Sequence, residues 1–468
     1  MMKKNLISVA VGSAVLLVAT ASIAVPFNSF DPKSMAMGGA GVAVANPSTA
    51  PFFNPALLSV AHQDDDFSLE LPVIGARVFD PDDFVDAVDE FDDTVVDRLD
   101  ISIDQYNASA TQANADQVIS DINAVNDEVL TLSDKPFQFE GGAGIVLSIP
   151  GEKFGVAISA SATASFSGVL NYADAETVSN MTSDLNALSV LGACFDGSLT
   201  TQAQVEACVS ATLADGFNYV DIDPNSPTFG EVTFTASSTN ATDPSDVQST
   251  VQVLGVVLAD VGVTISREMA MFGTEIAIGL TPKVVSVTIF DYTASADNAD
   301  ADDVDGDDYS TDYSDFNLDV GVAINHKNGW RSGLVIKNII TQDYDAMNTD
   351  PATGIETATG TVISLKPQAR AGVSHTNSWS TVALDVDLTK NEGLGLAADD
   401  SQYVALGIEL DAFGWAQLRF GYRADTVNSD RDVLSAGIGI SPFGVHIDLG
   451  VAGNEDEVGG SFQLGFRF

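Results

Sequence analysis

The most constraining feature of this sequence is a period-two alternation of apolar with small or polar residues. From 154 to 172 the even positions are apolar or aromatic with one Gly, whereas most odd positions are Ser, Thr, Gly, Ala or Asn. Such alternation predicts a β-strand with one apolar face and one polar face. The strand is long enough to span a membrane and to project beyond it.

The same period recurs in thirteen further runs. In chain order these are 67–73, 137–149, 251–265, 276–292, 316–326, 330–340, 363–375, 382–388, 404–410, 418–424, 434–440, 445–451 and 462–468. The total of about fourteen is an even number, so an antiparallel barrel closes with both chain ends on the same side. We therefore predict an all-β fold, a transmembrane antiparallel β-barrel of about 14 strands with partly helical extracellular loops.

The connections between these runs form two alternating sets. The short set is 150–153, 268–274, 327–329, 376–378, 413–415 and 441–444. The longer or more charged set is 80–136, 173–250, 293–315, 341–361, 389–402, 425–432 and 452–460. Short periplasmic turns and long outer loops are the arrangement of outer-membrane barrels, and a soluble β-sandwich has no reason to alternate in this way.

The first 24 residues have the pattern of a signal peptide. Lys3 and Lys4 precede the uncharged apolar run 6–21, and Ser22-Ile23-Ala24 places small residues at the positions that a signal peptidase reads. We predict cleavage after Ala24, with an uncleaved anchor helix as the alternative. Past this point no uncharged apolar run reaches 18 residues, so the mature chain has no predicted membrane-spanning helix.

The charge of the chain excludes several partners. With 19 Lys and Arg against 66 Asp and Glu, the formal net charge is −47. Nucleic-acid binding needs a basic surface, as does docking on anionic inner-leaflet lipid, so neither is expected. Because 45% of the residues are hydrophobic, the chain is not a disordered acidic polymer.

The last strand carries an assembly mark. Phe462, Leu464, Phe466 and Phe468 alternate with small or polar residues, and the chain ends on the aromatic ring. This pattern resembles the C-terminal signal by which bacterial barrels are recognised by the barrel-assembly machinery. The prediction is therefore insertion into the outer membrane of a Gram-negative bacterium.

A family resemblance enters after the cleavage site. The segments 30–41 (FDPKSMAMGGAG), 46–48 and 52–58 (FFNPALL) resemble the N-terminal segment of the FadL/OMPP1/TodX superfamily of transporters for hydrophobic compounds. Closer still is the likeness to TraF-type conjugal transfer proteins, which continues through 365–372 and 385–392. The resemblance implies a hatch inside a fourteen-stranded barrel. The hatch and ligand-passage residues that it implies are Gly38, Gly39, Gly41, Phe52, Phe53, Asn54, Pro55, Ala56 and Leu57.

The residues themselves favour a compact hatch. Its glycines permit backbone conformations closed to other residues, and Pro47, Pro51 and Pro55 prevent regular strand pairing. The alternative is a flexible periplasmic tail, which the apolar character of 35–58 disfavours. We therefore divide the chain into a signal peptide (1–24), a hatch (25–62) and a barrel (63–468) with loop inserts at 80–136 and 173–250.

The two inserts differ in pattern. Within 80–136 the period becomes helical, from Phe84 to Leu99 and from Val118 to Leu132, which predicts two acidic amphipathic helices. They form either a structural cover, the favoured interpretation, or a lid. In the second insert Cys194 lies before a weakly helical run, 199–211, and Cys208 lies within it. In an oxidising compartment we expect one disulfide between them, worth about 3 kcal/mol.

The remaining polar clusters do not define a catalytic or cofactor site. Asp303, Asp305 and Asp307 lie in an acidic loop around Gly306, but their spacing does not fit a calcium loop. A solvated loop that meets lipopolysaccharide through divalent cations is favoured over a defined metal site. The four His are scattered, and the hydrolase, zinc-protease and phosphate-loop motifs are absent, so we expect no enzyme and no cofactor.

The functional prediction follows from the fold and the resemblance. We expect a monomer that contacts outer-membrane lipid and lipopolysaccharide. It would pass small hydrophobic compounds, fatty-acid-like or aromatic, inward through a hatch-gated barrel without an energy source. The alternative is a conjugal-transfer-associated or other surface assembly protein.

Overall fold

The computed structural model describes most of the chain. The described residues are 22–23, 30–60, 67–84, 94–95, 97–109, 111–194, 201, 203–204, 207–208, 220–222, 232–234, 248–271, 274–295, 307–349, 353–394, 396, 400–412 and 414–467. Within them, the side chains of 22–23, 183–184, 187–194, 220–222, 232–234 and 307 are left out. None of the described helices is long and apolar enough to cross a membrane.

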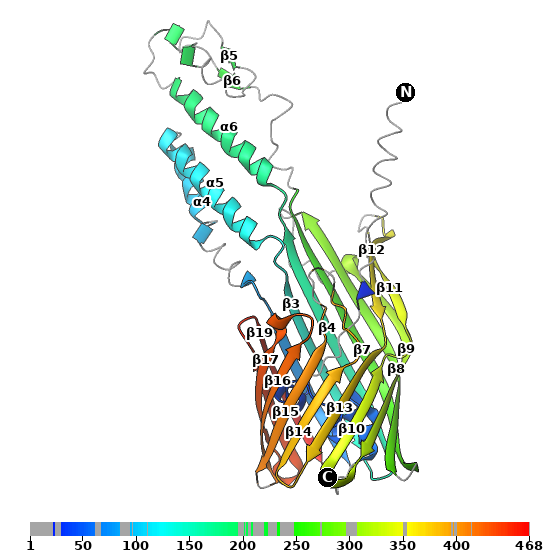
Figure 1. Ribbon diagram of the computed structural model, residues 1–468. Coiled ribbons are helices and arrows are strands. Elements are labelled where there is room, and N and C mark those ends of the chain that lie inside the picture. The colour runs from blue at the N-terminus through cyan, green and yellow to red at the C-terminus, as the bar shows by residue number, and fades with distance from the viewer. Residues whose placement is uncertain are drawn as a thin grey trace.

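Fourteen antiparallel strands close into a barrel, which confirms the predicted fold (Figure 1). Their bounds are β2 Ser68–Phe79, β3 Phe137–Ile149, β4 Phe154–Asn171, β7 Thr250–Met271, β8 Thr274–Ser295, β9 Ser310–Asn325, β10 Trp330–Lys337, β13 Gln368–Thr376, β14 Ser380–Asp387, β15 Tyr403–Ala412, β16 Ala416–Asp425, β17 Val433–Ile440, β18 Val445–Gly453 and β19 Glu457–Arg467. The ring closes where β19 pairs with β2, with Phe462 opposite Ile74.

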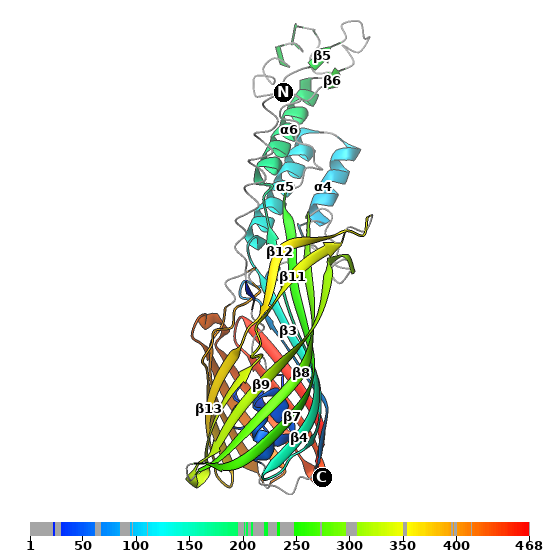
Figure 2. The ribbon, with the colours of Figure 1, turned by 90° about the vertical axis from the view of Figure 1, so that its right-hand side faces the viewer.

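The barrel wall is uneven in height. β7 and β8 have 22 residues each, about 70 Å of extended chain, whereas β14 and β17 have 8. A strand of 9–11 residues suffices to cross a bilayer. One side of the wall therefore only spans the membrane, and the other rises far above it on the side of the long loops (Figure 2). We call this side the loop end and the opposite side the turn end.

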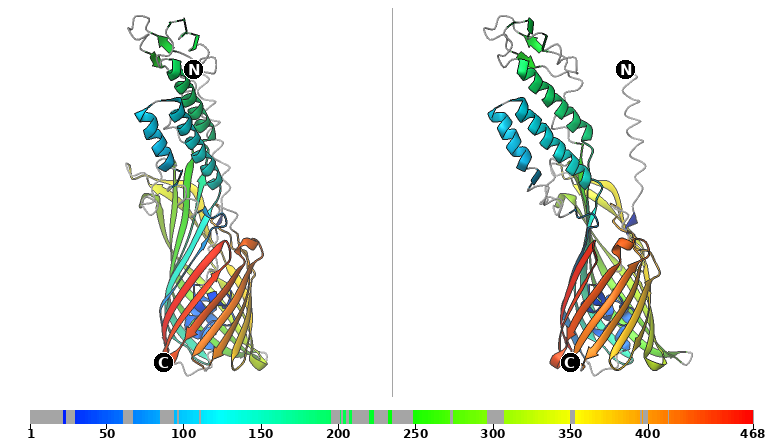
Figure 3. Two further views of the ribbon diagram at one scale, coloured as in Figure 1. Left: turned by 90° about the vertical axis from the view of Figure 1, so that its left-hand side faces the viewer. Right: turned by 60° about the vertical axis from the view of Figure 1, so that its left-hand side comes forward.

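Helices of the two inserts stand above the loop end (Figure 3). The first insert holds α4, Asp97–Ala108, and α5, Gln112–Leu132; the second holds α6, Ala175–Cys194, and the short pair β5, Val220–Ile222, and β6, Val232–Phe234. Thr111 caps α5 by accepting from Asn114 N. Most of the predicted helical run from Phe84 to Leu99 lies outside the described residues; α4 overlaps its end and continues to Ala108. The sequence did not predict α6.

A hairpin at the loop end replaces the predicted loop 341–361. β11, Gln342–Thr349, pairs with β12, Glu356–Leu365, and β12 also pairs with β1, Ser22–Ile23. The predicted strand 363–375 is therefore wrong at its start, because Lys366 and Pro367 separate β12 from the barrel strand β13. Proline has no N–H to donate to a strand ladder, which explains the break. The predicted cleavage point after Ala24 lies outside the described residues.

The segment 30–60, which we call the luminal segment, lies inside the barrel (Figure 2). It contains α2, Pro32–Ala36, and two 3₁₀ helices, η2, Pro47–Phe52, and η3, Pro55–Ser59. Further one-turn 3₁₀ helices are η6 Asp307–Tyr309, η7 Lys327–Gly329, η8 Ser429–Arg431 and η9 Pro442–Gly444. Each of α2, η2 and η3 begins with a proline, whose fixed φ suits the first helical position.

Candidate functional site

The barrel wall is apolar outside and polar inside. On β18, Ile447, Leu449 and Val451 are 45–59% exposed, while His446 and Asp448, which alternate with them, are buried. A soluble β-protein has the opposite arrangement, because its apolar face must be buried. The chain is therefore an outer-membrane β-barrel, and its functional surface is the lumen.

The lumen collects positive charge in a strongly acidic chain. Nine of the 19 Lys and Arg residues lie on the luminal segment or on the inner face of the wall: Lys33, Arg77, Lys283, Arg331, Lys337, Arg370, Arg419, Arg423 and Arg467. Arg419 pairs with Glu409 at 2.7 Å and Asp448 at 2.5 Å. Carboxylates of the same inner face, among them Glu70, Asp319 and Glu457, offset these cations, so the interior carries mixed charge.

Polar side chains of the wall fix the first half of the luminal segment. Asp385 on β14 accepts from the backbone N–H groups of Gly41 and Val42 at 2.7 and 2.8 Å. Ser435 on β17 donates to Ala36 O at 3.1 Å and accepts from the backbone N–H of Gly38 at 3.0 Å. Lys33 pairs with Glu409 at 3.2 Å. The segment is therefore held by bonds to several separate strands.

The second half is fixed by close packing. A Cβ added at Gly279 on β8 would overlap the backbone of Pro55 and Ala56, and one added at Gly321 on β9 would overlap the Asn54 side chain. Asn54 donates to Val42 O at 3.0 Å and to Val322 O on the wall at 3.1 Å. η3 therefore lies directly against the wall backbone.

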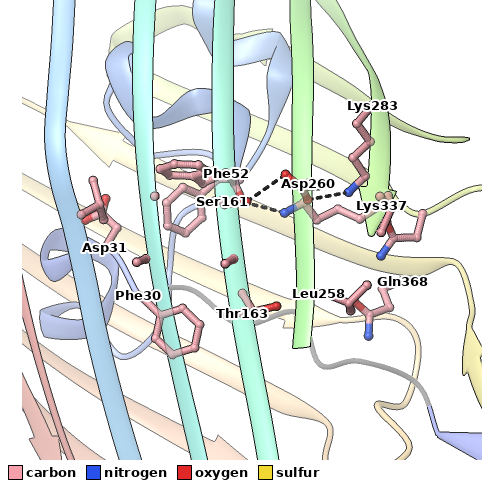
Figure 4. Close-up of a pocket in the computed structure, with 17 residues that line it drawn as sticks. Phe30, Asp31, Phe52, Ser161, Thr163, Leu258, Asp260, Lys283, Lys337 and Gln368 are labelled. Atoms are coloured by element: carbon pink, nitrogen blue, oxygen red, sulfur yellow. Dashed lines mark hydrogen bonds and ion pairs between the residues drawn. The ribbon is translucent and has the colours of Figure 1, made fainter. Parts of the chain in front are cut away.

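A chamber lies between the luminal segment and the long side of the wall (Figure 4). It is lined by Phe30, Asp31, Phe52, Phe53, Val73, Ala143, Gly144, Ser161, Ala162, Thr163, Leu258, Asp260, Lys283, Val285, Lys337, Asn338 and Gln368. Its volume is about 90 Å³. We call it the loop-side chamber. Two aromatic rings and aliphatic side chains form its apolar part, and a few charged groups form its polar edge.

The polar edge is already internally paired. Lys283 binds Asp260 at 3.3 Å and Asp319 at 3.1 Å, and Ser161 donates to Asp260 at 2.9 Å. Lys337 donates to Phe52 O at 2.9 Å, which ties the luminal segment to β10. These groups orient the chamber and leave its apolar part for a ligand.

A second, smaller cavity of about 40 Å³ lies across Phe30 from the loop-side chamber. The Tyr403 ring is stacked by Arg423, whose guanidinium carbon is 4.5 Å from the ring centroid, and Arg423 also binds Glu457 at 2.6 Å. Phe30 lines both cavities and so forms the partition between an apolar space and a charged one.

The predicted hatch residues occupy two different environments. Phe52 and Phe53 line the loop-side chamber. Asn54, Ala56 and Leu57 are fully buried against the wall, and Leu57 does not line the chamber. Whether the segment moves as a hatch stays a prediction.

Gly38, Gly39 and Gly41 lie on the first half of the segment. Gly38 and Gly39 have φ of +71° and +98°, values that favour glycine, and Gly38 also lies against the Tyr422 backbone. Gly41 packs directly against the Phe53 ring. The glycines thus shape the turn that follows α2.

Several other predicted residues are covered only in part. Phe462, Leu464 and Phe466 face outward on β19, opposite Leu449, Ile447 and Val445 on β18. Phe468 lies outside the described residues, as do Asp303, Asp305 and the side chain of Asp307. No group of three or more potential metal ligands occurs in the part of the chain that is described.

The disulfide stays a prediction. Cys208 is disulfide-bonded in the structure. The side chain of Cys194, its expected partner, is not among those described.

Sequence reasoning missed the charged luminal residues, above all Asp385, Lys283 and Lys337. A signal for them exists, because in a chain with few bases a Lys or Arg inside an alternating run must face the lumen. The partner of each could not be read, because pairing across strands depends on register.

Comparison with known proteins identifies the family of the chain. A family model described as the F plasmid transfer operon TraF protein matches residues 51–387, most of the chain. The chain belongs to this TraF family. The predicted family resemblance is thereby confirmed. No curated protein matches the chain.

Three solved structures that are similar to this TraF family member share little sequence with it. The Ralstonia pickettii toluene transporter TbuX is 11% identical, with 94% of this chain and 99% of that chain covered and a TM-score of 0.45. The CymD monoaromatic hydrocarbon channel is 10% identical, with 96% and 98% covered and a TM-score of 0.46. A Pseudomonas aeruginosa FadL homologue is 9% identical, with 96% and 99% covered and a TM-score of 0.45. Likenesses this distant do not identify a substrate.

Proposed function

We propose that this protein passes small hydrophobic compounds inward across the outer membrane, through the lumen and past the luminal segment. The observation that carries the proposal is the loop-side chamber, where Phe30, Phe52 and Leu258 form an apolar pocket inside an otherwise charged lumen. Apolar clefts with a few placed polar groups are the usual form of small-molecule sites. The outer-membrane lipid, with lipopolysaccharide, is the barrier that the compound would bypass.

A buried apolar cluster connects the loop end with the lining of the chamber. The hairpin residues Tyr344 and Ile363 pack with Leu254 and Ile289 of the long strands in one buried cluster. Val285 belongs to this cluster and also lines the chamber. A hydrophobic compound that enters beside the hairpin would therefore stay in contact with apolar side chains until it reaches the luminal segment.

Passage requires movement, because the chamber is small. Its volume of about 90 Å³ is below the roughly 150 Å³ of a cavity that binds benzene. An occupant would therefore displace part of its lining, and the luminal segment contributes Phe30, Phe52 and Phe53 to that lining. Nothing in this path requires an energy source, so the proposed transport is passive, through a monomer.

The test fills the chamber with a larger side chain and leaves the strand pairing of the barrel unchanged. Leu258→Trp would fill the apolar part from β7, while Val263→Trp places the same ring on the lipid-facing side of the same strand, where Val263 is 46% exposed. We would measure accumulation of a panel of fatty acids and aromatic hydrocarbons in a deletion strain that carries each variant. Uptake should fall several-fold for Leu258→Trp and stay at the wild-type level for Val263→Trp. Equal accumulation in the wild-type, Leu258→Trp and deletion strains would refute the proposal.

A second candidate is a surface assembly role in conjugal transfer. The family description and the helices α4, α5 and α6 above the loop end favour it. Deletion of 97–132, which removes α4 and α5, distinguishes the two. Loss of mating or surface assembly with intact uptake would favour assembly, and the converse would favour transport.

A further inference from the structure

A third cavity lies on the opposite side of the luminal segment, toward the turn end. Its lining includes Val44 and Val60 of the luminal segment, Trp330 and Arg331 at the start of β10, and Arg467 at the end of β19. Its volume is about 520 Å³, within the range of small-molecule sites and far larger than the loop-side chamber. We call it the turn-side chamber.

The chamber has more positive than negative groups. Lys33, Arg331 and Arg467 line it, and Glu409 is the one carboxylate among its lining residues. Glu409 is already engaged, because it binds Lys33 at 3.2 Å and Arg419 at 2.7 Å. Arg467 is paired as well, with Glu70 at 3.8 Å, which leaves Arg331 as the Lys or Arg of the lining without a direct carboxylate partner among the described residues.

Arg331 is the least compensated of these cations. Its Nε donates to Asn325 Oδ1 at 2.9 Å, and Asn325 in turn donates to Glu268 at 3.4 Å. Among the described residues no carboxylate oxygen lies within 4.0 Å of its guanidinium, whereas Arg370, Arg419 and Arg423 each have one. A partly buried guanidinium without a direct counter-charge favours an anion beside it.

Part of the remaining lining is apolar, beside the polar residues Asn46, Asn325, His326, Thr376 and Thr381. Ala43, Val44, Ala45 and Val60 line the chamber from the luminal segment, and Trp330 lines it from the wall. An inorganic ion would gain nothing from these surfaces, whereas an organic anion would bury an apolar body against them. The lining therefore matches a molecule with one negative group and a compact hydrocarbon part.

We propose that the turn-side chamber is a binding site for a small organic monoanion, with Arg331 as the residue that recognises the charge. Arg467, which donates to Ser48 at 3.2 Å and pairs with Glu70 at 3.8 Å, contributes a second, partly compensated cation from the last strand. The site lies on the exit side of the luminal segment and goes beyond the proposed uptake, because binding is measured on the purified protein without any transport.

The experiment varies charge at constant size. We would measure equilibrium binding of benzoate, benzyl alcohol and benzylamine to the purified full-length protein in detergent. Benzoate should bind at least about tenfold more tightly than benzyl alcohol, and benzylamine most weakly. In Arg331→Gln the preference for benzoate should fall about tenfold, because Gln still donates to Asn325 but carries no charge. Arg467→Gln should reduce it by a smaller factor.

The matched control is Lys327→Gln, which removes an exposed cation from the β9–β10 turn at the same end of the barrel. It should leave benzoate binding unchanged. Benzoate binding no tighter than that of benzyl alcohol, or equal losses in Arg331→Gln and Lys327→Gln, would overturn the proposal. Loss in Leu258→Trp with retention in Arg331→Gln would place the anion in the loop-side chamber and would overturn it too. Failure of uptake in cells leaves this binding result unaffected, so the two proposals fail separately.

Discussion

On the side of the barrel formed by β7, β8 and β9, the wall meets the luminal segment through glycine positions and uncharged hydrogen bonds. On the side formed by β14 to β18, wall glycines such as Gly407 and Gly421 also lie against the segment, and Asp385 and Glu409 bind it in addition with charged side chains. A buried charged contact is lost when one partner is neutralised, whereas close backbone packing does not depend on charge. We therefore expect the hold on residues 31–46 to depend on charge as well as on packing, and the hold on residues 54–60 to depend on packing and uncharged hydrogen bonds.

The largest expected effect on stability lies at the centre of the charged side. Arg419→Leu would leave Glu409 and Asp448 buried without their shared cation, which costs about 3 kcal/mol or more. The midpoint of urea unfolding in lipid vesicles should fall, and a protease should cut near Lys33 before it cuts near Leu57. The triple variant with Glu409→Gln and Asp448→Asn should recover most of the loss. Unchanged protease resistance in Arg419→Leu would show that charge does not hold the first half.

The packed side is tested by adding one methyl group. Gly279→Ala would place a Cβ into the backbone of Pro55 and Ala56, and overpacking of this kind costs about 1–3 kcal/mol. Gly460→Ala is the matched control, because the nearest atom to its added Cβ is 4.0 Å away. Protease accessibility of the luminal segment should rise in the first variant only. If both variants behave alike, η3 is not held by close fit.

Asn54 links residues 54–60 to Val42 in the first half of the luminal segment, so replacing it tests whether the two halves depend on each other. Asn54→Ala leaves the carbonyls of Val42 and Val322 without this donor, which costs about 1–2 kcal/mol. Barrel formation, followed by heat-modifiable mobility in gels, should stay intact, while uptake of hydrophobic compounds should change. A variant that fails to form the barrel would mean that the segment is needed for the wall itself.

The smallest expected effect lies at the base of α6 on the packed side. Burial raises the pKa of Asp174, but bonds from Ser249 and from the backbone of Gln248 outweigh it, so its pKa lies below the usual value. The stability that it contributes is present above the unfolded pKa and is lost as pH falls through the folded pKa. Proteolysis at 248–249 should therefore increase only in strongly acidic buffer. Asp174→Asn should remove this pH dependence, and an unchanged profile would count against the role of Asp174.

The sequence indicated all fourteen barrel strands, because every one alternates with a period of two and every one has a lipid-facing apolar set. Prediction from the sequence failed for elements that have no lipid-facing apolar set. β11 and β12 lie above the membrane, so Asp343 and Asp345 interrupt their apolar pattern. α6 is rich in Ser, Thr and Asn, which have low helix propensity.

The lumen was only half predictable. Gly38 and Gly39, together with Asn54-Pro55, indicated a compact inner segment from the sequence alone. Neither the pairing of Lys283 with Asp319 nor the isolation of Arg331 could be derived in this way. Both depend on which residues become neighbours once fourteen registers are fixed.

The tight fit between Gly279 and η3 has a consequence for biogenesis. The luminal segment precedes β2 in the chain, and the ring is completed only when β19, the last strand, pairs with β2. If the segment entered after the ring had closed, the folded segment would have to pass Gly279 and Gly321, where it lies against the wall backbone. We therefore expect the segment to fold against an open, curved sheet before the final strand encloses it.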